Sequence, residues 1–156
     1  MSLYYHKHHF IPLDRTLELY FVGCTQGCRN CHNAFLKERS ESVTRVLSVK
    51  EVLDELKDYI HVTTQVHILG GEPLEQNLDE LSDLLKGLKN LGFKNIVLFT
   101  GKNLTQDYID ETMWLFQHCD YLKTGNYDES QLNIEKSKSI LGFSLATKNQ
   151  KIIQIK

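Results

Sequence analysis

Short apolar segments alternate with one-sided helical segments along most of this chain. Strand-like runs occupy residues 17–23 (LELYFVG), 65–69 (QVHIL), 95–99 (NIVLF) and 119–123 (CDYLK). Helical patterns lie between them, at residues 48–60, 77–92 and 108–117. The first helical pattern opens with a capping box, in which Ser48 precedes Glu51 by three residues. Strands that alternate with helices predict an α/β fold built on a parallel sheet.

A polar or glycine-rich loop follows each strand-like segment. The four loops read GCTQGCRNCHN, GGEP, TGKN and TGNYDE, in chain order. In parallel sheets, ligands bind beyond the carboxyl ends of the strands. We therefore expect these four loops to converge on one face of the molecule and to form its functional site.

Three of the four cysteines lie within eight positions, at Cys24, Cys28 and Cys31, and Cys119 lies far downstream. Three thiolates at this spacing can bind zinc with His32 or Cys119 as a fourth ligand, or hold three irons of a four-iron cluster. A cluster with three protein ligands leaves one iron open to a substrate or cofactor. Cys119 is expected to be a small buried hydrophobe, as free cysteine commonly is.

Size and charge limit the number of domains and the kinds of partner that this chain can have. The 156 residues, 41 % of them hydrophobic, can bury one core, so a single domain over residues 1–156 is expected. The net charge of −2 without a basic block gives no case for nucleic acid or membrane as a partner. No run approaches the roughly 18 apolar residues of a spanning helix, so a soluble cytoplasmic protein is expected. In that reducing compartment, clustered cysteines indicate metal binding or catalysis rather than disulfides.

The CxxxCxxC spacing of CTQGCRNC resembles that of the radical S-adenosylmethionine (SAM) enzymes, and GGEP resembles their glycine-rich turn that receives the SAM amino group. CHN, the TG of LFTGKN, YLKTGNYDE and TKNQKI further resemble the small activating proteins of anaerobic ribonucleotide reductase. The resemblance spans nearly the whole chain. It implies a partial, open TIM-type barrel of parallel strands alternating with helices. A chain of this length is expected to form five or six strands.

The resemblance also implies the cofactors and their ligands. Cys24, Cys28 and Cys31 would bind a 4Fe-4S cluster, and SAM would be cleaved reductively to a 5′-deoxyadenosyl radical, with no catalytic residue beyond the cofactor ligands. Glu72 would accept a bond from the SAM ammonium. The expected cofactor contacts are Asn30, His32, Gly70, Gly71, Glu72, Pro73, Thr100 and Gly101. Simpler readings remain open: residues 70–73 as a plain turn, Glu72 as a solvated carboxylate, and His32 as an exposed loop residue.

The partners implied are a glycyl radical enzyme, most specifically the large subunit of anaerobic ribonucleotide reductase, and an electron donor such as flavodoxin or ferredoxin. The chain departs from those activases by reading FIPLDRTLEL where they carry Asn or Asp before Gly-Pro-Gly. Two other functions stay open. One is a radical SAM enzyme acting on a small molecule or peptide, and the other is a non-catalytic zinc or iron–sulfur module.

Three further expectations concern packing. The N-terminal histidines His6, His8 and His9 are expected to belong to a flexible terminus. Trp114 and Phe116 are expected to be packing residues. A leucine stripe is expected to face the core, at positions Leu78, Leu81, Leu85 and Leu88.

Overall fold

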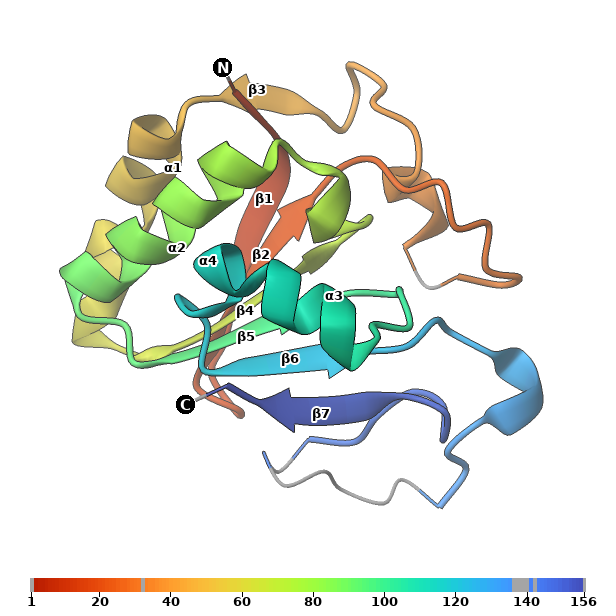
Figure 1. Cartoon of the computed structure of the whole chain (residues 1–156). Helices are drawn as coiled ribbons and strands as arrows, with labels where there is room; N and C mark the ends of the chain where they lie inside the picture. Colours follow the sequence, from red (N-terminus) through yellow and green to blue (C-terminus); the bar gives the residue numbers. More distant parts are fainter. Residues whose placement is uncertain (1, 32, 136–140, 142, 156) are drawn as a thin grey trace.

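The computed structural model describes residues 2–31, 33–135, 141 and 143–155. Seven strands form one sheet in the described residues, in the order β3-β1-β2-β4-β5-β6-β7 (Figure 1). The strands are β1 (Leu3–Ile11), β2 (Thr16–Phe21), β3 (Arg45–Leu47), β4 (Gln65–Gly70), β5 (Asn95–Phe99), β6 (Tyr121–Thr124) and β7 (Lys151–Gln154). This open sheet confirms the α/β class.

The centre of the sheet is parallel and its flanks are antiparallel. Strands β2, β4, β5 and β6 pair in parallel, whereas β1, β3 and β7 pair antiparallel to their neighbours. The described sheet therefore has more strands than the five or six expected, and its edges are antiparallel where a barrel of parallel strands was expected. The four parallel strands are the four that the apolar runs predicted.

The N-terminal segment is ordered, so the expectation of a flexible terminus is wrong. Strand β1 forms a hairpin with β2 and a second antiparallel pair with β3. The ring of His6 donates through Nδ1 to the carbonyl of Val43 at 2.7 Å, and the ring of His8 packs edge-on against Tyr59 at 5.2 Å. His9 lies opposite Glu18 in the β1–β2 register.

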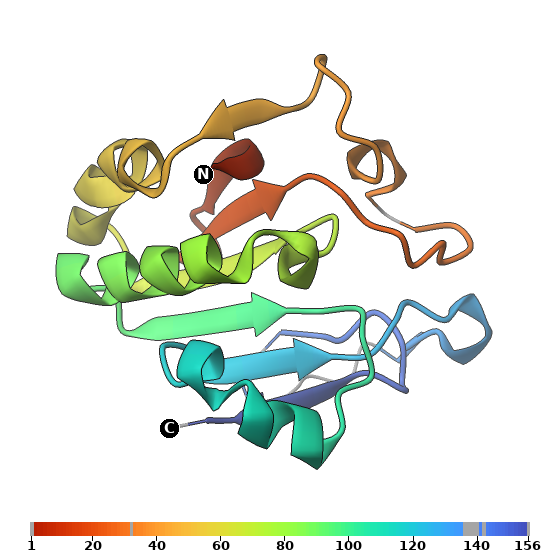
Figure 2. The same ribbon diagram turned by 45° about the horizontal axis from the view of Figure 1, so that its top comes forward.

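The helices α1 (Val49–Leu56), α2 (Leu78–Leu91), α3 (Gln106–Glu111) and α4 (Met113–Phe116) cover one face of the sheet (Figures 1 and 2). The capping box at Ser48 is present, and Gly92 ends α2 in the left-handed conformation. Two boundaries differ from the sequence patterns. The first helix continues after Leu56 as a 3-10 turn, and the last is two short helices that meet at Thr112, whose backbone is not helical.

The core lies between this helical layer and the sheet. Leu81, Leu85 and Leu88 are fully buried, and Leu78 is partly buried against the same cluster. Each fully buried leucine stabilises the fold by about 1.5–3 kcal/mol. Phe116 is buried as expected, but Trp114 is 44 % exposed, so its assignment as a packing residue is wrong.

The other face of the sheet is covered in part by the chain that follows β6. The ring of Phe143 packs against His67 on β4 and Phe99 on β5, at 5.1 and 5.7 Å between centroids. Burial lowers the pKa of His67 to about 4, so its imidazole is neutral at physiological pH. No helix within the described ranges is long and apolar enough to cross a membrane.

Candidate cofactor site

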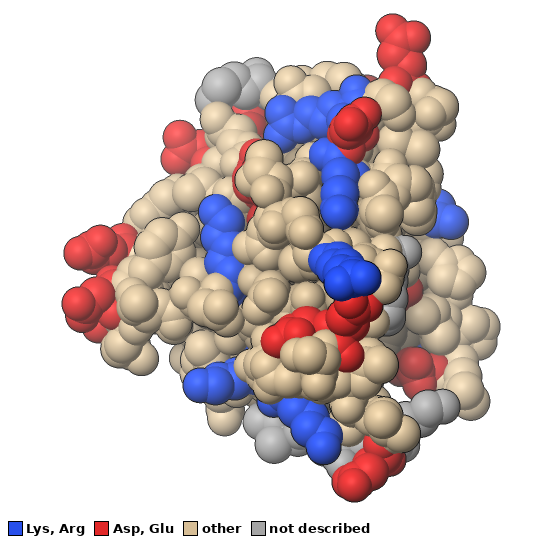
Figure 3. Space-filling view, turned by 90° about the vertical axis from the view of Figure 1, so that its right-hand side faces the viewer, with Lys and Arg blue, Asp and Glu red and all other residues tan. Residues whose placement is uncertain are grey.

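A cavity of about 260 Å³ lies at the carboxyl ends of the four parallel strands. Its lining comes from the loops after β2, β4, β5 and β6 and from the chain before β7. The predicted convergence of the four loops is therefore confirmed. Figure 3 shows this side of the molecule, where acidic and basic side chains are interspersed rather than gathered into a patch of one sign.

The cysteine loop (residues 24–31) leaves the sheet at Gly23, where its backbone is hydrogen-bonded to two other segments of the chain. The Gly23 N–H donates to the carbonyl of Leu36 at 2.7 Å, and the Cys24 N–H donates to Lys37 at 3.0 Å. The carbonyl of Gly23 accepts the N–H of Glu72 at 2.8 Å. The cysteine loop is thus closed at its base and joined to the turn after β4.

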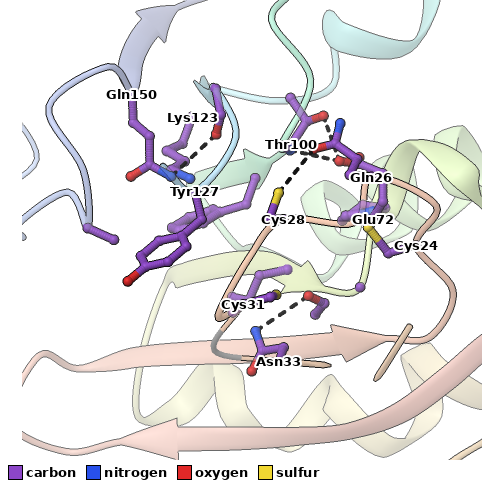
Figure 4. A pocket seen from close by; sticks show the side chains of 18 of the residues that line it. Cys24, Gln26, Cys28, Cys31, Asn33, Glu72, Thr100, Lys123, Tyr127 and Gln150 are labelled. Carbon is purple, nitrogen blue, oxygen red and sulfur yellow. Dashed lines mark hydrogen bonds between the residues drawn. The ribbon is translucent and has the colours of Figure 1, made fainter. Parts of the chain in front are cut away.

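All three cysteines of the loop line the cavity (Figure 4), and each is half-buried. Burial raises the pKa of the Cys24 thiol, so a bound cation would be needed to favour its thiolate. Cys119 is 0 % exposed within the core, and the cavity lining does not include it. The expected burial of Cys119 is confirmed.

Three thiols from one loop, beside a cavity and without a fourth cysteine, are a donor set that fits a 4Fe-4S cluster with three protein ligands. Within the residues that the structure describes, no three Cys, His, Asp or Glu side chains are close enough together to hold a metal ion. His32, the candidate fourth zinc ligand and SAM contact, lies outside the described residues.

The GGEP turn (residues 70–73) contributes all four of its residues to the cavity wall. Glycine is required here by neighbouring backbone. A Cβ on Gly70, where φ is 120°, would lie 2.4 Å from the nitrogen of Phe21, and one on Gly71 would lie 2.6 Å from the carbonyl oxygen of Gly23. The close approach that these glycines permit is made by the chain itself, between this turn and the start of the cysteine loop.

Glu72 is 1 % exposed, so the reading of it as a solvated carboxylate is wrong. Its Oε1 accepts the Thr100 hydroxyl at 3.0 Å and the Gly101 N–H at 2.7 Å, and its Oε2 accepts the Leu74 N–H at 3.0 Å. Burial raises the pKa of Glu72, and these three donors oppose that effect. Because an ionised carboxylate has about four acceptor sites, one remains for a further donor.

The other expected SAM contacts fall into two groups. Pro73, Thr100 and Gly101 line the cavity with Glu72. Asn30 does not line it, because its backbone has a φ of 53° and its side chain donates to Glu129 at 2.5 Å. The structure therefore directs Asn30 towards the loop after β6.

Lys123 was not among the residues expected at the site. It projects from β6 into the cavity opposite the cysteines (Figure 4). Burial lowers the pKa of Lys123 to about 8, although the charges of Glu72 and Cys28 act in the opposite direction. Its ammonium lies 5.6 Å from the centre of the Phe99 ring, and no carboxylate in the described chain forms an ion pair with it. The segment YLKTGNYDE contains Lys123, so the signal was present in the sequence.

The chain before β7 completes the cavity. Gln150 donates to the carbonyl of Gly125 at 3.3 Å and accepts the N–H of Thr147 at 3.1 Å. Asn149 donates to the carbonyl of Asn126 at 2.9 Å. The segments TGNYDE and TKNQKI, which both contributed to the family resemblance, therefore contact each other at the site.

Comparison with known proteins gives a family and one distant relative. The family model of a 4Fe-4S single cluster domain matches residues 15–153. The chain is also 23 % identical over 150 residues to a protein named biotin synthase from Gluconobacter oxydans (strain 621H). That alignment covers 92 % of this chain and 41 % of the relative, so the chain spans less than half of the relative's length. The chain belongs to the family of 4Fe-4S single cluster domains, and its likenesses place it with the radical SAM superfamily.

Proposed function

We propose that the protein is a radical SAM activating enzyme that generates a glycyl radical on a partner enzyme, most specifically on anaerobic ribonucleoside-triphosphate reductase. One observation carries the proposal. The three cysteines and the GGEP turn, which come from separate strands, line the same cavity. A cluster and a SAM molecule bound there would be adjacent. The four parallel strands of the open sheet fit the partial barrel that the family resemblance implies.

The chain's own residues would bind and orient the cofactors. Cys24, Cys28 and Cys31 would hold the cluster, and the wall formed by residues 70–73 and 100–101 would receive the methionine end of SAM. The remaining acceptor site of Glu72 suits an ammonium group. When bound and reduced, the cluster supplies one electron that breaks a carbon–sulfur bond of SAM, which gives methionine and a 5′-deoxyadenosyl radical. A glycine of the partner would supply the hydrogen atom that completes 5′-deoxyadenosine, and would itself become the glycyl radical.

A protein substrate is supported by the openness of the sheet. The four α-helices cover one face, and among the described residues of the segment after β6, Phe143 packs on the other. A reactive carbon radical has to be shielded from solvent, and a docked partner loop would do this. The interspersed charges on the loop side give no case for a polyanionic partner (Figure 3). The electron would come from a low-potential donor of the flavodoxin or ferredoxin class.

A second candidate is a radical SAM enzyme that acts on a small molecule. The similarity to a protein named biotin synthase favours it, since that match covers most of this chain. A module that binds zinc or a cluster without catalysis is the third candidate.

The test uses protein that has been reconstituted anaerobically with iron and sulfide and then reduced. It is incubated with SAM and a reductase large subunit whose glycines carry deuterium. We expect a glycyl radical signal in the electron paramagnetic resonance spectrum and deuterium in the 5′-deoxyadenosine. Efficient hydrogen transfer from a small molecule without the subunit would favour the second candidate. Zinc uptake without any iron–sulfur spectrum would favour the third.

A further inference from the structure

Two carboxylates from outside the cysteine loop bind it on opposite sides of its central cysteine. Glu75, at the end of the 3-10 turn Pro73–Glu75, accepts both the N–H and the hydroxyl of Thr25, each at 2.9 Å. Glu129, in the 3-10 turn Glu129–Gln131, accepts the side-chain amide of Asn30 at 2.5 Å and pairs with Nε of Arg29 at 3.1 Å. Glu75 lies outside the sequence motifs described above, and Glu129 ends the segment YLKTGNYDE but had been given no role of its own.

The bonded residues alternate with the candidate ligands along the chain. Thr25 directly follows Cys24, whereas Arg29 and Asn30 are the two residues between Cys28 and Cys31. Glu75 therefore fixes the backbone beside the first thiol. Glu129 fixes the segment that separates the second thiol from the third.

The backbone that carries each glutamate is held by its surroundings. The carbonyl of Glu75 accepts the Arg39 guanidinium at 3.2 Å, and that guanidinium lies 3.8 Å above the ring of Tyr4 on β1. Glu129 follows Asp128, whose carboxylate caps the turn by accepting the N–H of Ser130 at 3.0 Å. Glu75 thus connects the cysteine loop to the sheet, and Glu129 connects it to the loop after β6.

The bond to Asn30 also stabilises a backbone conformation. Asn30 has a φ of 53°, in the left-handed region that asparagine tolerates better than most residues. A side chain bonded to Glu129 restricts the neighbouring peptide units to that conformation. The spacing between Cys28 and Cys31 is thereby set by a residue almost a hundred positions away in the sequence.

We propose that Glu75 and Glu129 are positioning residues for the cluster, which hold the two halves of the cysteine loop at the separation that three-thiolate binding requires. The inference rests on the cluster of the proposed function and is independent of which glycine or small molecule is the substrate. Groups that orient metal ligands in this way commonly govern metal retention without touching the metal.

The test measures the rate at which reconstituted protein loses its cluster to an iron chelator, followed by visible absorbance under anaerobic conditions. Glu75→Ala and Glu129→Ala are expected to lose it about fivefold faster, because each removes hydrogen bonds to a charged acceptor. Glu75→Gln and Glu129→Gln, which keep an acceptor oxygen, should restore much of the retention. Glu41→Ala is the matched control, since the Glu41 side chain is exposed and has no hydrogen bond or ion pair in the described chain.

Two further readouts separate positioning from general stability. The reduced clusters of both alanine variants should give broadened electron paramagnetic resonance signals while their melting temperatures stay close to that of the parent protein. Arg29→Ala combined with Glu129→Ala should lose the cluster no faster than Glu129→Ala alone, because Arg29 acts through its ion pair with Glu129.

The proposal is overturned if both alanine variants retain the cluster as long as Glu41→Ala, or if the unaltered protein takes up no cluster. It is also overturned if faster loss merely follows a lower melting temperature. Neither SAM nor a partner protein is present in these assays. An unaltered protein that retains its cluster but produces no glycyl radical would therefore refute the activase role and leave the positioning role standing.

Discussion

Replacing Lys123 by methionine is expected to make the cofactor-free protein more stable at neutral pH. Lys123 is mostly buried beside the cavity, where burial lowers its pKa from 10.5 to about 8. At 1.36 kcal/mol for each pH unit, keeping this ammonium charged in the folded state costs about 3 kcal/mol. Water in the adjoining cavity reduces that cost, so we expect Lys123→Met to raise the free energy of unfolding by about 1–3 kcal/mol. Methionine also keeps an apolar contact with the ring of Phe99.

The gain in the free energy of unfolding that Lys123→Met brings should fall as the pH rises. Below about pH 8 the lysine is charged in both states, and the folded state bears the full cost. Between about pH 8 and 10.5 the folded protein releases the proton while the unfolded chain retains it, so the stability of the parent protein rises relative to the variant. The advantage of Lys123→Met is therefore expected to shrink across this interval and to vanish above it.

Urea unfolding followed by circular dichroism, at pH 7 and pH 10 with the thiols kept reduced, measures both effects. Lys86→Met is the control, because Lys86 is exposed on α2 and should change stability by less than about 0.5 kcal/mol. A Lys123→Met protein that is less stable than the parent at pH 7, or whose advantage is the same at both pH values, would refute the reasoning. A residue that destabilises its own fold at a cavity is better explained by binding than by packing.

Three other substitutions test the site. Cys119→Ala should leave the iron and sulfide content of the reconstituted protein unchanged, whereas alanine at any one of the other three cysteines should abolish it; iron loss in Cys119→Ala would contradict the ligand assignment. Glu72→Ala should lower the free energy of unfolding by about 3 kcal/mol, because it leaves three donors without their acceptor. A loss no larger than that of exposed Glu111→Ala in the same urea titration would argue against a stabilising role for the Glu72 carboxylate. Gly70→Ala should cost at least about 2 kcal/mol through its positive φ and its contact with Phe21, and near-parental stability would show that the turn adapts.

The sequence predicted the parallel centre of the fold because periodicity is a local signal. Strands β4 and β5 are short apolar runs, and α2 carries a leucine face between a cap at Asn77 and a stop at Gly92. Strand β1 was not predicted because the polar run HKHH interrupts the alternation of apolar and polar residues. Its register with β2 also shifts between Tyr5 and Lys7. Strands β3 and β7 have three and four residues, and only distant pairing partners define them.

The site was predictable to a similar extent. The cysteine spacing and the GGEP turn marked two walls of the cavity, because both are contiguous motifs. Lys123 was missed because its direction depends on strand order, which places β6 beside β5 and turns that side chain towards the cysteines. Asn30 was assigned to the cofactor from its place beside Cys31, but the structure bonds it to Glu129. The TGNYDE loop that carries Glu129 was expected at this face, but no local pattern indicates which of its side chains contacts the cysteine loop.

The contact of Gly70 and Gly71 with the backbone at Phe21 and Gly23 limits how these two motifs can be transplanted. A protein engineer who moved the cysteine segment onto another parallel sheet would also need two glycines at the end of the adjacent strand, since a Cβ at either position would overlap the incoming chain. The hydrogen bonds from Gly71 to Phe21 and from Glu72 to Gly23 join the two segments as one backbone unit. The smallest portable piece of this site is therefore a pair of neighbouring strand ends with both of their loops, and neither loop can be exchanged by itself.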